Sequence, residues 1–243
     1  MRIGILDWGI GGMGLLKLLR ENTTADIIYF SDAGYTPYGK VHQAELLHRV
    51  EKVIRWFRDQ KADKIAVACN AASTVIPPDM NITGIIEHGI SMVLDEKIKE
   101  VVVAGGKRTV ESEIYKTALE KAGINVTQTI GQPLSARVEA GDLDSPGLEK
   151  DIEMVFEKVK NKKHILLACT HYPVISANIQ NFLPHAKLLD PDRQMWNWIK
   201  NNWPPLSGNA TVQFFTSGDT QNMKNSAEKA FGISIDSIEK IKV

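Results

Sequence analysis

Short apolar runs alternate with longer amphipathic runs along almost the whole chain of 243 residues. The short runs have the length of buried strands, and the longer runs repeat apolar residues every three or four positions, as amphipathic helices do. Strands separated by helices need crossover connections, which produce mostly parallel sheets. The pattern therefore predicts an α/β fold, with strands at residues 2–6, 26–30, 64–68, 101–104, 126–130, 164–168 and 212–216.

The same alternation indicates two domains. The strand–helix pattern pauses near residues 92–96 and starts again at Val101. A Pro-, Gly- and Asn-containing stretch at residues 201–209 has the composition of a linker, and an apolar run follows it. We expect that last run to return to the first sheet. The predicted domains are residues 1–93 together with 208–243, and residues 94–207.

Charge and cysteine content narrow the class of protein. Lys and Arg total 29, as do Asp and Glu, so the net charge is zero and a general binder of nucleic acid or of anionic membranes is not expected. Two cysteines do not make a disulfide scaffold. No run approaches the ~20 apolar residues of a membrane span, and the amino terminus lacks a signal-peptide core. The sequence predicts a soluble cytoplasmic protein.

Polar and reactive residues stand directly after the predicted strands. Asp7 follows the first strand, Asp32 the second, Cys69 the third, and Cys169 with His171 the strand at 164–168. Ligands of parallel sheets bind beyond the carboxyl ends of the strands. We therefore expect the functional site to form from these residues.

A glycine-rich loop follows the first predicted strand. Gly9, Gly11 and Gly14 match the G-x-G-x-x-G pattern of dinucleotide-binding loops, and Asp32 is placed to bind a ribose. However, Asp7 and Trp8 separate the strand from the first glycine, and a carboxylate there would repel a phosphate. We favour a tight strand-to-helix turn over a nucleotide site.

The two cysteines occupy equivalent positions, each at a predicted strand–helix junction where helix amides lower the pKa of a thiol. Each thiol taken alone also fits a small buried hydrophobe. A metal site lacks further ligands near Cys169 and His171, and a Cys169–His171 nucleophile pair leaves Cys69 idle. Two-base proton transfer at a carbon atom uses both thiols, one on each face of the substrate.

Seven stretches of the sequence carry a further signal: DWGIGGMGLLKLL, SDAGYTPYGK, ACNAAST, GIIEHG, RTVESEIY, PLSARVEAG and ACTHYP. Together they resemble the glutamate racemase branch of the aspartate/glutamate racemase superfamily. The resemblance implies two pseudo-symmetric α/β domains, with the active site in the cleft between them and no dinucleotide on the glycine loop. It also implies a cofactor-independent isomerase without a metal, which interconverts L- and D-glutamate for peptidoglycan synthesis. A homodimer is compatible with it, since such enzymes often form dimers.

The resemblance also implies roles for individual residues. Cys69 and Cys169 would be the opposing bases, with Asp7 assisting Cys69, and with His171 and nearby Glu139 assisting Cys169. The remaining matched positions would bind the two carboxylates and the amino group of the substrate: Pro37, Tyr38, Gly39, Asn70, Thr109 and Thr170. The structural alternatives are a helix cap for Asp7, a structural hydrogen bond for His171 and a solvated surface position for Glu139.

Two substrate-binding positions depart from the family pattern. Trp8 stands where the family usually has serine, and Ala71 where it usually has threonine. A hydrogen bond to a charged group contributes about 1.5–3 kcal/mol, so losing two would cost about 10²–10⁴ in binding or rate. The alternatives to glutamate racemisation are therefore a different substrate, such as aspartate, or a catalytically weakened binding or regulatory protein.

Overall fold

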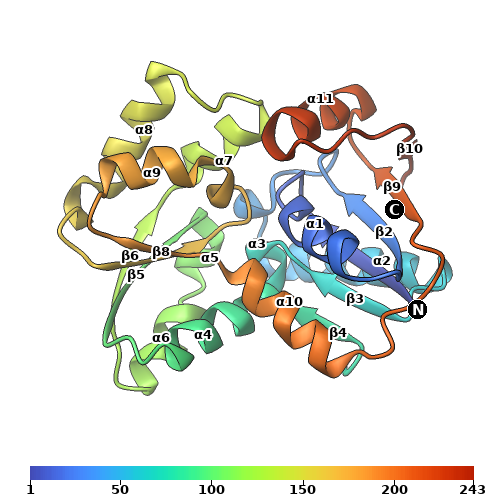
Figure 1. The fold of residues 1–243 in the computed structure, drawn as a ribbon, viewed down its shortest axis with the longest axis horizontal. Helices are drawn as coiled ribbons and strands as arrows, with labels where there is room; N and C mark the ends of the chain where they lie inside the picture. The colour runs from blue at the N-terminus through green and yellow to red at the C-terminus, as the bar shows by residue number, and fades with distance from the viewer.

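The computed structural model describes residues 1–243 and contains two parallel β-sheets flanked by helices (Figure 1). The first sheet has six strands in the order β10-β9-β2-β1-β3-β4, and the second has four in the order β6-β5-β7-β8. Every strand pair is parallel. The predicted α/β fold with mostly parallel sheets is confirmed. None of the helices combines the length and the apolar character that crossing a bilayer requires.

Both ends of the chain build the first sheet. Its elements and their flanking helices are β1 (Arg2–Asp7), α1 (Met13–Asn22), β2 (Asp26–Ser31), the 3-10 turn η1 (Tyr38–Lys40), α2 (Gln43–Asp59), β3 (Lys64–Val67), α3 (Asn70–Ser73), β4 (Ile82–Gly84), α4 (Ile85–Asp95), β9 (Val212–Thr216), α11 (Thr220–Phe231) and β10 (Glu239–Lys240). The strand at 212–216 does return to this sheet, where it pairs with β2.

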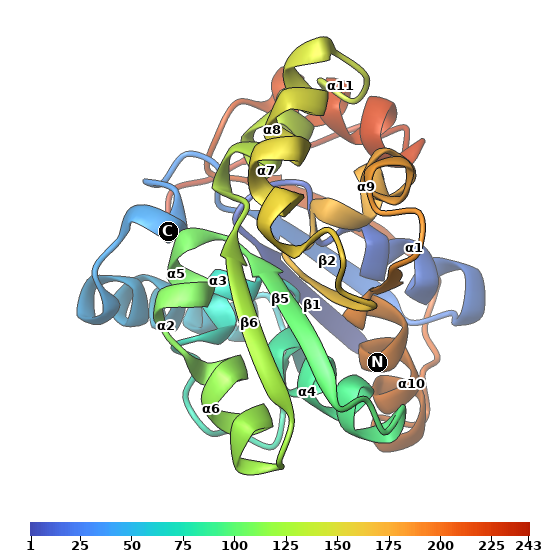
Figure 2. The ribbon, with the colours of Figure 1, turned by 90° about the vertical axis from the view of Figure 1, so that its left-hand side faces the viewer.

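The middle of the chain builds the second sheet. Its elements are β5 (Glu100–Gly105), α5 (Lys107–Glu111), α6 (Ile114–Lys121), β6 (Asn125–Ile130), α7 (Gln132–Glu139), α8 (Pro146–Phe156), η2 (Glu157–Val159), β7 (His164–Ala168), η3 (Tyr172–Ile175), α9 (Ser176–Phe182), β8 (Lys187–Leu189) and α10 (Pro191–Asn202). Figure 2 shows β5 and β6 side by side, with α5 and α7 following at their carboxyl ends.

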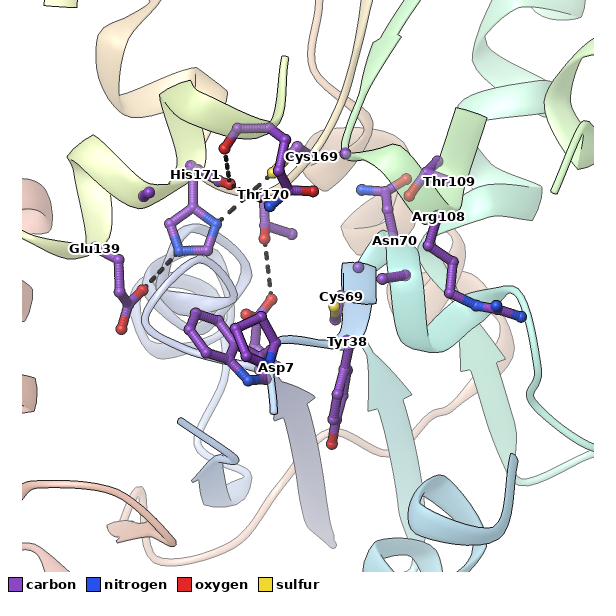
Figure 3. A pocket seen from close by; sticks show the side chains of 18 of the residues that line it. Asp7, Tyr38, Cys69, Asn70, Arg108, Thr109, Glu139, Cys169, Thr170 and His171 are labelled. Carbon is purple, nitrogen blue, oxygen red and sulfur yellow. Dashed lines mark hydrogen bonds and ion pairs between the residues drawn. The ribbon is translucent and has the colours of Figure 1, made fainter. Parts of the chain in front are cut away.

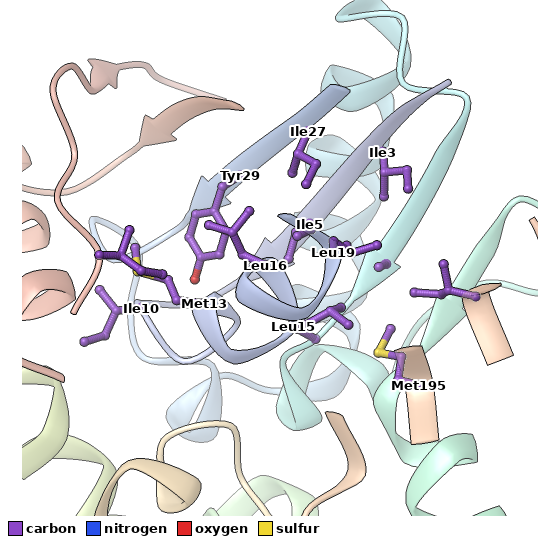
Figure 4. Close-up of a cluster of buried hydrophobic side chains, with 14 of the residues drawn as sticks. Ile3, Ile5, Ile10, Met13, Leu15, Leu16, Leu19, Ile27, Tyr29 and Met195 are labelled. Carbon is purple, nitrogen blue, oxygen red and sulfur yellow. The ribbon is translucent and has the colours of Figure 1, made fainter. Parts of the chain in front are cut away.

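Both faces of the first sheet are buried, because successive side chains of a strand point to opposite faces. Ile3 and Ile5 of β1 pack with Leu15, Leu16 and Leu19 of α1 on one face (Figure 4). The intervening strand residues pack on the other face, against α2. The apolar run of β1 and the helical spacing of α1 therefore fold together, which fixes where the loop between them lies.

Helix α10 follows the second sheet along the chain but packs against the helices of the first. It lies beside α4 and α1 (Figure 1), and its Met195 and Ile199, with the following Trp203, join the core cluster around β1. The domain boundaries at residues 93 and 208 stay a prediction.

Candidate active site

A pocket of about 570 Å³ lies between residues that follow strands of both sheets (Figure 3). Asp7 and Cys69 come from the ends of β1 and β3, and Cys169 comes from the end of β7. Every residue that the sequence singled out for catalysis or substrate binding lines this pocket: Asp7, Trp8, Pro37, Tyr38, Gly39, Cys69, Asn70, Ala71, Thr109, Glu139, Cys169, Thr170 and His171. The structure thus brings these residues together, while their roles stay predictions.

Cys69 lies on the wall that the first sheet contributes. It is the residue before α3, and its carbonyl accepts the amide of Ser73. Burial raises the pKa of the Cys69 thiol well above its usual value, and the negative charge of Asp7 raises it further. The expectation that helix amides lower this pKa is wrong for Cys69, because α3 has only four residues and the burial outweighs its amides. Cys69 is therefore a protonated thiol at neutral pH.

Asp7 is fully buried at the end of β1. Its carboxylate accepts the amide of Gly9 at 3.0 Å and the hydroxyl of Thr170 at 3.0 Å. Burial raises the pKa of Asp7, although the charge of His171 and these two hydrogen bonds act in the opposite direction. Asp7 does not cap α1, which begins after Gly12 with no side-chain cap. Through the hydrogen bond from Thr170, Asp7 instead connects the end of β1 to the residue that follows Cys169.

His171 connects Cys169 to Glu139. Its Nδ1 lies 3.7 Å from the sulfur of Cys169, and its Nε2 lies 2.7 Å from a carboxylate oxygen of Glu139. Burial alone would lower the pKa of His171, but the hydrogen bonds and negative charges of Cys169 and Glu139 raise it well above its usual value. Both ring nitrogens then donate, one to sulfur and one to carboxylate. His171 is an imidazolium that presents a positive donor to the Cys169 sulfur.

The glycine loop is filled by side chains of the protein itself. The amide of Gly9 donates to Asp7, and the amide of Ile10 donates to Glu139 at 3.1 Å. A Cβ atom on Gly9 would lie 2.2 Å from a Glu139 oxygen, and one on Gly11 would lie 2.1 Å from the hydroxyl oxygen of Thr170. The glycines therefore allow the second sheet's residues to approach closely. A pyrophosphate at this loop would meet two carboxylates and few free amides.

Asp32, which the sequence suggested as a ribose contact, instead forms hydrogen bonds with other side chains of the protein. It is fully buried and accepts hydrogen bonds from the Arg49 Nε at 2.8 Å and from the Tyr38 hydroxyl at 2.6 Å. Arg49 also donates to the terminal Val243. This network holds Tyr38 in the pocket wall. Nothing in the local sequence pointed to Arg49, because its partner lies on another element.

The two positions that depart from the family pattern both line the pocket. The indole of Trp8 packs against the core between the first sheet and α2, and its Nε1 donates to the carbonyl of Tyr35 at 3.1 Å. Ala71 is half-buried in the first turn of α3. Trp8 is therefore held against the first sheet and still lines the pocket. Neither Trp8 nor Ala71 presents a hydroxyl group to the pocket.

Other lining residues were not identified from the sequence: Lys40, Gly106, Arg108, Gln132, Pro133, Ser135, Ala136, Ala140 and Ala168. Gly106 and Gln132 lie at the ends of β5 and β6, so the strand-end rule could have found them. Arg108 and Lys40 carry no such signal. The structure holds no cluster of three or more His, Cys, Asp or Glu side chains placed to bind a metal ion.

Replacing Glu139 by glutamine should lower the pKa of His171 and make the change in stability depend on pH. The folded-state pKa of His171 lies above the ~6.5 of an unfolded histidine. The stabilisation from its charged state is therefore complete below that value, and it is lost as the pH rises through the folded-state pKa. We expect Glu139→Gln to lower the free energy of unfolding by about 1–3 kcal/mol at pH 6 and by less at alkaline pH.

Urea unfolding at several pH values and NMR titration of the histidine rings measure both effects. Glu153→Gln on α8 is the matched control, because it removes the same charge from an exposed position away from the pocket. An equal loss of stability at pH 6 and at alkaline pH would contradict the charged His171–Glu139 pair.

No family model matches the chain, but individual known proteins are similar to it in sequence and in fold. Over 97% of its length the chain is 28% identical to a glutamate racemase of Aquifex aeolicus, covering 96% of that protein, and 29% identical to one of Hydrogenobaculum, covering 95% of it. The crystal structure of glutamate racemase from Campylobacter jejuni matches with a TM-score of 0.85 at 26% identity, over 94% of this chain and 97% of that one. Over nearly its whole length the chain is therefore similar in sequence to these glutamate racemases, and it shares the fold of the Campylobacter jejuni enzyme.

Proposed function

We propose that this protein is a glutamate racemase that works without a cofactor, by two-base proton transfer between Cys69 and Cys169. The observation that carries the proposal is that one thiol from each sheet lines the same pocket. Figure 3 shows the two cysteines on opposite walls, with His171 beside Cys169 and Asp7 on the side of Cys69. A substrate between these walls can lose a proton to one thiol and receive one from the other.

The resting structure suits one direction of the reaction directly. Cys169, whose sulfur lies 3.7 Å from Nδ1 of His171, acts as the thiolate that takes the α-proton from one face of the amino acid. The electron pair of the broken C–H bond stays on the carbon and is delocalised into the α-carboxylate. The protonated Cys69 then donates its proton to the opposite face, which forms the new C–H bond. The opposite direction begins with Cys69 as thiolate and Cys169 as thiol.

The remaining wall residues supply groups for the charged ends of glutamate. Tyr115 donates to the side-chain oxygen of Asn70 at 2.8 Å, which leaves the Asn70 NH₂ group free for a carboxylate. Thr109 lies on the opposing α5, within the same pocket. We assign these two residues to the α-carboxylate. The turn around Tyr38 and Gly39, fixed by Asp32, is assigned to the side-chain carboxylate.

The biological role follows from the reaction. A racemase of this kind supplies D-glutamate for peptidoglycan synthesis in the cytoplasm, as the resemblance to the family implies. Two similar structures support the ligand class, since a glutamate racemase of Francisella tularensis is in complex with D-glutamate and the Escherichia coli enzyme is in complex with L-glutamate. The absence of a hydroxyl at Trp8 and Ala71 favours weaker binding of the substrate than in enzymes that keep both groups.

Circular dichroism of the amino acid tests the function. The protein is incubated with L-glutamate, D-glutamate and L-aspartate in separate samples, and the optical signal is followed in time. We expect both glutamate samples to reach the same racemic end point. Conversion of aspartate but not of glutamate would mean that aspartate is the substrate. Binding of glutamate without conversion would indicate a binding protein with this fold.

A further inference from the structure

The pocket lining contains more positively charged side chains than its carboxylates pair with. Glu139 is paired with His171, and Asp7 is buried with hydrogen bonds to Gly9 and Thr170. Two further charged side chains, Lys40 and Arg108, also line the pocket, and neither forms an ion pair with any carboxylate of the protein. The pocket therefore offers two positive groups without a negative partner.

Arg108 is held in place with one donor group left over. It extends from α5, and its Nε donates to the hydroxyl of Thr74 at 2.9 Å. Its Nη1 donates to the carbonyl of Val41 at 3.4 Å, and its Nη2 has no hydrogen-bond partner in the structure. Burial lowers the pKa of Arg108, and the negative charge of Glu111, with which Arg108 forms no ion pair, offsets this effect only in part. A partly desolvated guanidinium with a free N–H group is a site for an anion.

The position of Arg108 selects one end of the substrate. Val41, its hydrogen-bond partner, directly follows η1, which contains Tyr38, Gly39 and Lys40. Helix α5 packs against η1, so the two positive groups lie at the junction between these elements. Figure 3 shows the Arg108 side chain running past Asn70 with its guanidinium pointing away from the two cysteines. Arg108 therefore lies beyond the reacting α-carbon, near the turn assigned to the side-chain carboxylate.

We infer that Arg108 is a specificity-determining residue, whose guanidinium binds the side-chain carboxylate of a dicarboxylic amino acid, with Lys40 adding positive charge at the same end. The inference rests on the proposed racemase function and names the group that selects an acidic over a neutral side chain. Thr74 and Val41 keep the guanidinium in one orientation, so little freedom is lost when the carboxylate binds.

The experiment compares glutamate with glutamine, which has nearly the same shape but an uncharged side chain. We expect Arg108→Gln to reduce the ratio of kcat/KM for glutamate to kcat/KM for glutamine by about 10- to 100-fold, chiefly through KM for glutamate. Arg108→Lys should restore part of the ratio, because it keeps the charge. Lys107→Gln is the matched control, since Lys107 is the neighbouring cation on α5, pairs with Glu111 and does not line the pocket.

The ratio separates recognition from a structural role. If Arg108 only joins α5 to Thr74 and Val41, Arg108→Gln will lower kcat/KM for both amino acids equally, and an unchanged ratio overturns the inference while racemisation by the unmodified protein still stands. If the unmodified protein racemises neither amino acid, the proposed function fails. The affinities of the same variants for glutamate and glutamine, measured by calorimetry, then test the inference. It predicts that Arg108→Gln lowers the ratio of the affinity for glutamate to the affinity for glutamine.

Discussion

Replacing either cysteine by serine should lower kcat for glutamate racemisation by about 10²–10⁴-fold, in both directions. A serine hydroxyl is nearly the same size as a thiol but is far less acidic, so it neither forms an anion beside His171 nor delivers a proton readily. Cys69→Ser removes the proton donor on the side of the first sheet, and Cys169→Ser removes the base that contacts His171. Each reaction needs both groups, so the loss should be similar from L- and from D-glutamate.

Circular dichroism rates with both enantiomers measure this prediction. Thermal unfolding of each variant is the control, and we expect little change in melting temperature because the substitution removes no packing volume of note. The double variant should be about as inactive as either single variant, since the two thiols act in one reaction. A single serine variant that keeps more than about a tenth of the activity would show that its thiol is not an essential acid or base.

Gly11→Ala should disrupt the site from the loop behind it. Its Cβ atom would lie 2.1 Å from the Thr170 hydroxyl and 2.9 Å from Nδ1 of His171, both closer than atoms can approach. The loop and the segment after β7 must then move apart, which stretches the Thr170–Asp7 hydrogen bond. We expect a loss of about 1–3 kcal/mol in the free energy of unfolding. We also expect a fall in kcat of up to about 10²-fold, because misplacing a catalytic group by 1 Å has that effect.

Gly12→Ala is the matched control for Gly11→Ala. A Cβ atom on Gly12 has its nearest neighbour, the Cβ of Ala68, at 3.1 Å, so a small shift is enough to accommodate it. We expect a smaller loss of both stability and activity. Urea unfolding and initial racemisation rates of the two variants measure the difference. Equal losses would mean that the close approach of Gly11 to Thr170 and His171 does not hold the site together.

The sequence predicted the strands best where a buried apolar run is long enough to recognise. The seven predicted strands all occur, and each end differs from the predicted one by at most one residue. The short strands β4, β8 and β10 were missed, because two or three residues carry no periodicity. The packing of α10 against α1 and α4 was not predictable either, since its apolar stripe shows that it packs but not on which partner.

The candidate site was predictable because reactive residues stand at the carboxyl ends of parallel strands, Asp7 and Cys69 in the first sheet and Cys169 in the second. The structure adds what depends on contacts between distant elements. Arg49 reaches Asp32 from α2, and Arg108 reaches Thr74 and Val41 from the second sheet's side of the pocket. The protonation of Cys69 was misjudged for the same reason, because burial depends on the surrounding fold rather than on the neighbouring residues.

Incorporation of solvent deuterium at the α-carbon tests the two-thiol reaction most directly. L- and D-glutamate are incubated separately with the protein in deuterium oxide, and substrate and product are separated and analysed by mass spectrometry at low conversion. The two-base account predicts that each molecule of inverted product carries one solvent deuterium, while the remaining substrate keeps its hydrogen. Inversion that retains the original hydrogen, or exchange in the substrate without inversion, would contradict the assignment of Cys69 and Cys169 to opposite faces of the carbon.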